Sequence, residues 1–308
     1  MPAKKAPGSR GSAVLKSRDA GVIAVAAPAG AVEEAALERG LGVLRDICPE
    51  ADIRVDDQAR ARRGYLAGPD QDRAAHLAEL MHDPDVGAVL AARGGFGSSR
   101  LLPLLDFGRL AASGKLLVGF SDLTCLLNPL AAAGAVAVHG PVLTQLHRLD
   151  AASRQDLAEV LRGRPAGPRE LTGRRLVPGR ARGRLMGGNL TMLCHLLGTP
   201  WFPPLADCIL FIEETNEPPY RLDRLLTQLE LAGAFQAASG VAVGRLSGQG
   251  EDAAELTETL ERRLAGLGRP VVVGLPFGHG AANRCLPMGA PAVLDGDAGL
   301  LLAGVNLV

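Results

Sequence analysis

The chain has 308 residues, enough for two domains with substantial cores. Its 33 Lys and Arg residues balance 33 Asp and Glu residues, so no net charge directs it toward nucleic acid or an anionic membrane surface. Only 3% of the residues are aromatic, which leaves few side chains to stack on single-stranded nucleic acid. We therefore expect a globular protein that binds neither nucleic acid nor membrane.

The cysteines and the N-terminal segment indicate the compartment. The five cysteines are scattered without a C-x-x-C pair, and most lie in apolar segments, as reduced core residues do. Residues 1–18 are basic and contain no apolar stretch of a signal peptide. No uninterrupted apolar run approaches the roughly 18 residues of a membrane span. We expect a cytoplasmic protein with a disordered tail at residues 1–18.

Strands alternating with helices are predicted over residues 19–147. Short apolar runs at 22–27, 86–91, 116–118 and 136–138 have the length of buried strands, and leucines at helical spacing follow the first three. This alternation predicts a parallel sheet covered by helices on both faces.

The second half of the chain has a different pattern. Residues 148–182 contain many arginines among Gly and Pro with few apolar residues, and we interpret this segment as an interdomain linker. A second domain is predicted at 183–308. It contains apolar strands at 208–212, 241–246 and 271–275, with helical segments between them, and ends in short strands with Gly-Asp turns.

Ser121 follows the strand at 116–118 and precedes a helical pattern that begins at Leu123. A serine on so sharp a turn exposes its hydroxyl, and the helix N-terminus supplies backbone N–H groups to a developing oxyanion. This arrangement is typical of a nucleophile elbow, although the G-x-S-x-G spelling is absent. The alternative is that Ser121 only caps the helix.

Two further polar residues, Glu213 and His279, also follow predicted strands. Sheets of this class place their sites at the carboxyl ends of strands. Together with Ser121 these residues supply a nucleophile, a base and an orienting carboxylate, in the chain order Ser, acid, His. A glycine on each side of His279 allows close backbone approach and an exposed imidazole.

The pattern leaves other residues open for the base and the acid. His139 also follows a strand, and the nearby alternative acids are Asp122, Glu214 and Glu217. A single strand-end His or Glu is more often structural than catalytic. Periodicity does not choose among these residues.

The remaining motifs argue against a cofactor or a metal. The loop 93–97, RGGFG, could cradle a phosphate, form the second wall of an oxyanion hole or simply be a tight turn. It has no G-K-[ST] and lacks the third Rossmann glycine. His76 and His82 are not spaced as H-E-x-x-H, and no matching ligand cluster accompanies His139 or His147. We expect no cofactor and no metal.

With these residues in view, the chain resembles the LD-carboxypeptidase family of serine peptidases. That family cleaves the terminal D-alanine from cytoplasmic murein tetrapeptides and includes immunity peptidases against microcin C. The matching segments follow the family's order and omit mainly the tail and the linker. They are VAAPAG (25–30), LAGPDQDRAAHL (66–77), AARGGFGSSRLLPLLD (91–106), VGFSDLT (118–124), HGP (139–141), GGNLTMLCHLLGTP (187–200), ILFIEETNEPPYRLDRLLTQLELAG (209–233) and LPFGHGAANRCLPMGAPAVL (275–294).

The resemblance implies roles for particular residues. The family's triad corresponds to Ser121 in GFSD, Glu213 after ILFI and His279 in GHG. Its oxyanion donors correspond to the backbone N–H of Asp122 and of a glycine in RGGFG, assigned here to Gly95. Small departures, such as Phe at positions 96 and 120, concern substrate preference rather than the triad.

The resemblance also implies a fold and a reaction. The fold would pair an N-terminal flavodoxin-like parallel α/β domain with a smaller β-rich C-terminal domain. The reaction would be hydrolysis of the L,D-peptide bond before the C-terminal D-alanine of murein tetrapeptide, by a cytoplasmic homodimer that recycles the cell wall. Hydrolysis of a microcin-C-type peptidyl-nucleotide is the alternative within this chemistry. A murein-fragment binder without catalysis is the alternative outside it.

Overall fold

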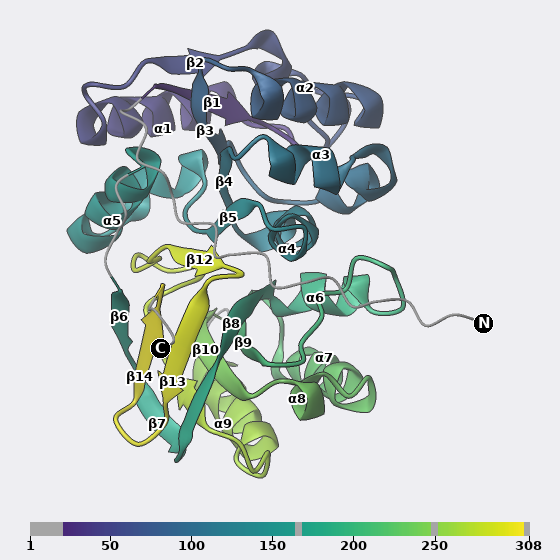
Figure 1. Cartoon of the computed structure of the whole chain (residues 1–308), viewed down its shortest axis with the longest axis vertical. Helices are drawn as coiled ribbons and strands as arrows, with labels where there is room; N and C mark the ends of the chain where they lie inside the picture. Colours follow the sequence, from purple (N-terminus) through teal and green to yellow (C-terminus); the bar gives the residue numbers. More distant parts are fainter. Residues whose placement is uncertain (1–20, 164–167, 248–251, 305–308) are drawn as a thin grey trace, which may run out of the picture.

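A computed structural model describes residues 21–163, 168–247 and 252–304. The expected disordered tail at 1–18 lies outside these residues. The chain forms two α/β domains, one above the other in Figure 1, each built around its own sheet.

The strands and helices of both domains have the following bounds. The strands are β1 Val22–Ala26, β2 Ile53–Val55, β3 Val86–Ala91, β4 Leu116–Gly119, β5 Val136–His139, β6 Arg169–Thr172, β7 Arg174–Val177, β8 Arg180–Asn189, β9 Cys208–Thr215, β10 Gly240–Ser247, β11 Val271–Val273, β12 Leu286–Met288, β13 Pro291–Asp295 and β14 Leu300–Ala303. The α-helices are α1 Glu34–Ile47, α2 Asp70–His82, α3 Phe107–Ala112, α4 Thr124–Ala132, α5 Ala151–Leu161, α6 Leu190–Leu196, α7 Pro219–Leu231, α8 Ala234–Ala237 and α9 Asp252–Leu264. The 3₁₀ segments are η1 Asp57–Arg60, η2 Ser98–Leu104, η3 Ser121–Leu123 and η4 Leu143–Arg148.

The N-terminal sheet has the strand order β12-β5-β4-β3-β1-β2. Its strands from β1 to β5 are parallel, in the 2-1-3-4-5 order of flavodoxin-like folds. β12 comes from the C-terminal part of the chain and pairs antiparallel with β5, with Leu286 opposite His139. The predicted flavodoxin-like fold is confirmed, with one added strand that joins the two halves of the chain.

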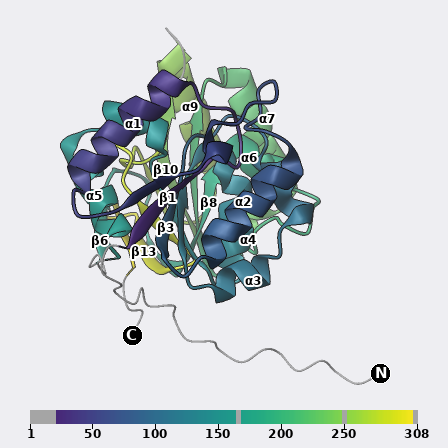
Figure 2. The same ribbon diagram turned by 90° about the horizontal axis from the view of Figure 1, so that it is seen from above.

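Alternating residues of β1 show how this sheet is buried on both faces. Ile23 and Val25 pack into the core formed with α1 and α5, whereas Ala24 and Ala26 belong to the core on the α2 and α4 side. Figure 2 shows these helices on opposite sides of the sheet. The core on the α2 and α4 side continues into the second domain, where it includes Phe211.

The C-terminal sheet has the strand order β6-β14-β13-β8-β9-β10-β11-β7. Its central strands β8, β9, β10 and β11 are parallel, and the outer pairings are antiparallel. The parallel strands are connected through α6, α7, α8 and α9. Figure 1 shows the carboxyl ends of β9 and β10 facing the N-terminal domain, below β12.

Two local predictions are wrong. Residues 148–182 are not an irregular linker, because they contain α5, β6, β7 and the start of β8. The helical pattern expected after the strand at 86–91 corresponds to the 3₁₀ segment η2, which contains Pro103, followed by the short helix α3. A proline lacks the N–H that a regular helix needs at this position.

Two further findings bear on the sequence predictions. All five cysteines are buried and unpaired. Within 21–163, 168–247 and 252–304, no helix combines the length and apolarity needed to cross a lipid bilayer.

Candidate active site

Ser121 follows β4 after one residue, Phe120, and begins η3. Its φ of 61° is in the left-handed region, which costs a non-glycine residue about 1–2 kcal/mol. Phe120 and Leu123 occupy the cap positions of η3 and α4, and no side chain makes a capping bond at either. The interpretation of Ser121 as a helix cap is therefore wrong. The strained turn is the backbone expected of a nucleophile elbow.

Two glycines leave room for this turn. A Cβ at Gly119 would lie 2.9 Å from Cγ of Leu123. A Cβ at Gly94 would lie 3.1 Å from Oγ of Ser121 and 3.4 Å from the amide nitrogen of Asp122. The loop after β3 therefore approaches the serine hydroxyl as bare backbone, and any larger residue at position 94 would crowd the hydroxyl.

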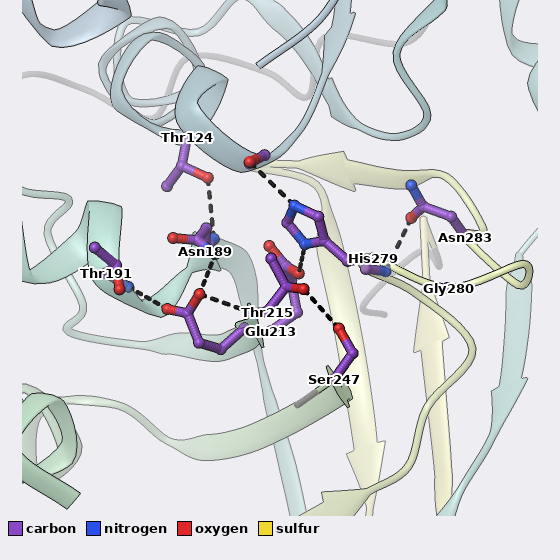
Figure 3. Close-up of polar contacts among 12 residues, drawn as sticks. Thr124, Asn189, Thr191, Glu213, Thr215, Ser247, His279, Gly280 and Asn283 are labelled. Carbon is purple, nitrogen blue, oxygen red and sulfur yellow. Dashed lines mark hydrogen bonds and ion pairs between the residues drawn. The ribbon is translucent and has the colours of Figure 1, made fainter. Parts of the chain in front are cut away.

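His279 joins Ser121 to Glu213. Its Nε2 is 3.1 Å from Ser121 Oγ, and its Nδ1 is 2.6 Å from Oε2 of Glu213. Figure 3 shows the imidazole of His279 above the carboxylate of Glu213, with a dashed line between them. The serine comes from the N-terminal domain, whereas the acid at the end of β9 and the histidine after β11 come from the C-terminal domain. The structure thus brings the three sequence-predicted residues into one hydrogen-bonded chain.

The loop that carries His279 is held by side chains that the sequence analysis did not identify. Asn283 Oδ1 accepts a hydrogen bond of 2.9 Å from the Gly278 N–H. Asn283 in turn donates through Nδ2 to Gln145 Oε1 at 2.9 Å, and Gln145 donates to the carbonyl of Gly280 at 3.2 Å. Gly278 has a φ of 108°, and a Cβ there would lie 2.9 Å from Oε2 of Glu213. Only glycine fits at position 278.

Burial and charge act in opposite directions on His279. Burial lowers the pKa of its imidazole, but the charge of Glu213, its hydrogen bond to Nδ1 and the charge of Glu214 raise it. The net effect is a pKa above the usual 6.5. Because the Glu213 side chain has no exposed surface, its carboxylate stabilises an imidazolium without screening by water.

The neighbouring acid Glu214 has a different role. Its Oε1 accepts hydrogen bonds from Asn189 Nδ2 at 3.0 Å and the Thr215 N–H at 2.8 Å, and its Oε2 accepts from the Thr191 N–H at 2.8 Å. Successive side chains of a strand point to opposite faces, so only one of the two glutamates can face His279. Burial raises the pKa of Glu214, against these hydrogen bonds. Glu214 thus fixes the start of α6.

The other alternative acids are also engaged elsewhere. Asp122 is buried, and its Oδ2 accepts a hydrogen bond of 2.8 Å from the Ser98 N–H. Its carboxylate therefore fixes η2 against η3. Glu217 forms an ion pair of 2.7 Å with Arg221, four residues along the chain. Neither carboxylate contacts His279.

His139, the alternative base, is fully buried in an aromatic cluster. Its ring lies 5.1 Å from that of Phe211, 5.8 Å from Phe120 and 6.0 Å from Phe277, in edge-to-face contacts. Neither of its ring nitrogens has a hydrogen-bond partner in the described part of the chain. Burial lowers the pKa of His139 to about 4. His139 is a neutral core residue that does not reach the Ser121 hydroxyl.

We expect His139→Leu to remove an acid-dependent loss of stability. Above the unfolded-state pKa of about 6.5, both folded and unfolded wild-type chains carry a neutral His139. Between about pH 6.5 and 4 only the unfolded chain gains the proton, so the wild type loses about 3 kcal/mol relative to the variant. Urea unfolding at pH 7 and pH 4.5 measures this difference. The exposed His195→Gln should show no such change, and an equal pH dependence of wild type and His139→Leu would contradict the prediction.

The backbone of the loop 93–97 lies beside Ser121, where the sequence predicts an oxyanion hole. Gly94 is the glycine whose backbone lies against Ser121 and the Asp122 amide. Gly95, next in the loop, has a φ of 97°, and a Cβ there would meet Arg93 and Gly30 instead. The assignment of the Gly95 and Asp122 N–H groups as oxyanion donors remains a proposal, which the closeness of Gly94 to Ser121 and to the Asp122 amide supports.

No group of three or more His, Cys, Asp or Glu side chains that could hold a metal ion occurs among residues 21–163, 168–247 and 252–304.

Comparison with known proteins identifies the family. The model of the LD-carboxypeptidase N-terminal domain matches residues 23–140, and that of the LD-carboxypeptidase C-terminal domain matches residues 182–294. Among curated relatives, the murein tetrapeptide carboxypeptidase of Pseudomonas aeruginosa is 37% identical over 290 residues, covering 90% of this chain and 94% of that protein. The microcin C7 self-immunity protein MccF of Escherichia coli is 26% identical over 268 residues, covering 76% and 78%.

A solved structure also supports this family assignment. The crystal structure of muramoyltetrapeptide carboxypeptidase from Oxalobacter formigenes matches this fold with a TM-score of 0.80 at 34% identity, covering 91% of this chain and 97% of that one. The fold, the two matching domain models and these relatives agree: the protein is an enzyme of the LD-carboxypeptidase family of serine peptidases.

Proposed function

We propose that the protein is a serine carboxypeptidase that hydrolyses the L,D-peptide bond before the C-terminal D-alanine of murein tetrapeptide, in cell-wall recycling. The observation that carries this proposal is the hydrogen-bonded chain from Ser121 through His279 to Glu213. The P. aeruginosa and O. formigenes relatives, named for this substrate, support the choice of peptide.

The proposed reaction has two halves. His279 Nε2 takes the proton of the Ser121 hydroxyl as its oxygen attacks the carbonyl carbon of the scissile bond. The oxyanion that forms accepts hydrogen bonds from the N–H groups of Gly95 and Asp122. The imidazolium, stabilised by Glu213, then gives its proton to the amine of D-alanine, which leaves. Water, deprotonated by His279, hydrolyses the acyl-enzyme and regenerates the serine.

A peptidyl-nucleotide of the microcin C type is the second candidate substrate, because MccF is also a relative. The lower identity, 26% against 37%, favours the murein peptide. A non-catalytic binder is disfavoured, since binding alone requires neither a strained serine nor a buried Glu213 beneath His279. Cytoplasmic location and a homodimer, both implied by the family resemblance, remain part of the proposal.

The test is incubation of the purified protein with murein tetrapeptide and, separately, with aspartyl sulfamoyl adenosine, followed by mass spectrometry. We expect free D-alanine from the tetrapeptide and none with Ser121→Ala. Cleavage of the aspartyl sulfamoyl adenosine alone would move the function to antibiotic immunity. Turnover of neither substrate would contradict the proposal.

A further inference from the structure

A carboxypeptidase must recognise the free carboxylate of the residue that it removes. In the proposed function, the leaving amine takes its proton from His279 Nε2. The amine and the carboxylate of an amino acid are separated by a single carbon atom. The carboxylate therefore lies on the His279 side of the site, away from the oxyanion donors, and a nearby cation would bind it.

Arg245 lies at this side of the site, in an irregularity of β10. Val243 pairs with Ile212 and Leu246 pairs with Glu214, so β10 has one residue more than β9 in this interval. The extra residue forms a β-bulge opposite Glu213. Bulges are uncommon between parallel strands, and next to active sites they redirect a side chain.

The bulge is tied to the loop that carries His279. The Arg245 N–H donates to the carbonyl of Phe277 at 2.9 Å, and the Leu275 N–H donates to the carbonyl of Val243 at 3.0 Å. A Cβ at Gly280 would lie 2.5 Å from Cδ and 2.6 Å from Nε of Arg245. The arginine side chain therefore runs across the backbone of Gly280, the residue after His279, in the space that a Cβ at position 280 would occupy. Figure 3 shows Gly280 close to His279.

The guanidinium of Arg245 is available to a ligand. The residue is exposed, and within the described ranges no carboxylate lies within ion-pair distance of it. Arg221 on α7, by contrast, is paired with Glu217. Arg93, the other arginine beside the site, donates to the carbonyl of Ala31 at 2.9 Å and lies along Gly95, on the oxyanion side.

We propose that Arg245 binds the C-terminal carboxylate of the substrate and thereby makes the enzyme an exopeptidase. This inference rests on the proposed function and names the group that recognises the leaving residue. A planar guanidinium can hold a carboxylate through two parallel hydrogen bonds, which fixes the orientation of the D-alanine as well as its charge.

The test compares murein tetrapeptide with the same peptide carrying a C-terminal D-alanine amide. We expect the wild type to prefer the free acid. Arg245→Gln should lower kcat/KM for the acid by about 10- to 100-fold and leave the amide unchanged, so that the preference disappears. Arg245→Lys should retain part of the preference. The exposed Arg224 on α7 supplies the matched control, and Arg224→Gln should behave as the wild type.

Equal losses for acid and amide in Arg245→Gln would overturn the inference, because a residue that only supports the loop affects both substrates. Calorimetric binding of acid and amide to Ser121→Ala, with and without Arg245→Gln, separates the inference from the proposed function. If the wild type hydrolyses neither peptide, the proposed function fails. The carboxylate site would still be supported if Ser121→Ala binds the acid more tightly than the amide and loses this preference when Arg245→Gln is added. If Ser121→Ala binds the acid and the amide equally, the inference is overturned.

Discussion

Ser121→Ala is expected to lower kcat for murein tetrapeptide by about 10⁴-fold or more and leave the fold intact. The hydroxyl lies 3.1 Å from Nε2 of His279, and its removal leaves the imidazole with nothing to deprotonate. His279→Ala should be as severe. The double variant should be no slower than either single variant, because the residues act as a unit. Single-turnover rates and circular dichroism of the purified variants measure both effects.

A glycine at position 121 supplies the matched control. The φ of 61° is costly for alanine but not for glycine, so Ser121→Gly should be about 1 kcal/mol more stable than Ser121→Ala. Both variants lack the hydroxyl, and both should be inactive. The two variants would then differ in stability while sharing the same loss of activity. Turnover by Ser121→Ala within about ten-fold of the wild type would exclude the serine mechanism.

Much of this site could be predicted because the residues follow strands. Ser121, Glu213 and His279 each stand where an apolar run ends, and parallel strands bring their carboxyl ends together. The pattern did not separate Glu213 from Glu214, or His279 from His139. The first choice depends on which face of β9 is directed toward His279, and the second on how deeply the carboxyl end of β5 is buried. Both depend on tertiary packing, which the neighbouring residues in the sequence do not reveal.

The segment 148–182 shows why a strand can be missed. In β8 the first exposed positions are arginines and the first buried ones are Ala181 and Gly183, so no large apolar residue marks the alternation before Leu185. A Cβ at Gly183 would lie 2.5 Å from the carbonyl oxygen of Asp207. Gly183, directly after the segment predicted as a linker, lies where β8 closely approaches the chain that enters β9. A strand that needs small residues for close packing and a flexible linker can therefore have the same amino-acid composition.

The hydrogen bonds that hold the His279 loop could not be predicted from the sequence either. Gln145 and Asn283 are 138 residues apart and meet only because β12 joins the N-terminal sheet beside β5. An antiparallel edge strand of three residues has no sequence signal of its own. The polar residues that hold an active-site loop depend on such long-range pairing.

Glu213→Gln tests the electrostatic part of the site. Glu213 and His279 are joined at 2.6 Å, with no exposed surface on the Glu213 side chain. Removing the negative charge removes the main support of the imidazolium, so we expect kcat/KM to fall by on the order of 10³- to 10⁴-fold. Glutamine keeps the shape and leaves burial of the imidazole unchanged.

The same variant should move the acid limb of the pH profile. The free enzyme is active when His279 is neutral, so activity is lost as pH falls through the pKa of His279. In the wild type the charge of Glu213 holds this pKa above 6.5. In Glu213→Gln the lowering effect of burial is no longer outweighed, and the limb should shift to lower pH. The remaining activity would then persist in more acidic buffer than that of the wild type.

Glu214→Gln is the matched control for this shift. Glu214 also raises the pKa of His279 by its charge, but it makes no contact with the ring and is bound to Asn189 and the start of α6. Its replacement should move the acid limb slightly in the same direction without the large loss of rate. Profiles of kcat/KM between pH 5 and 9 distinguish the two variants. An acid limb that stays in place in Glu213→Gln would show that another group sets the protonation of His279, and Glu213 would then be no more than a packing residue beneath the ring.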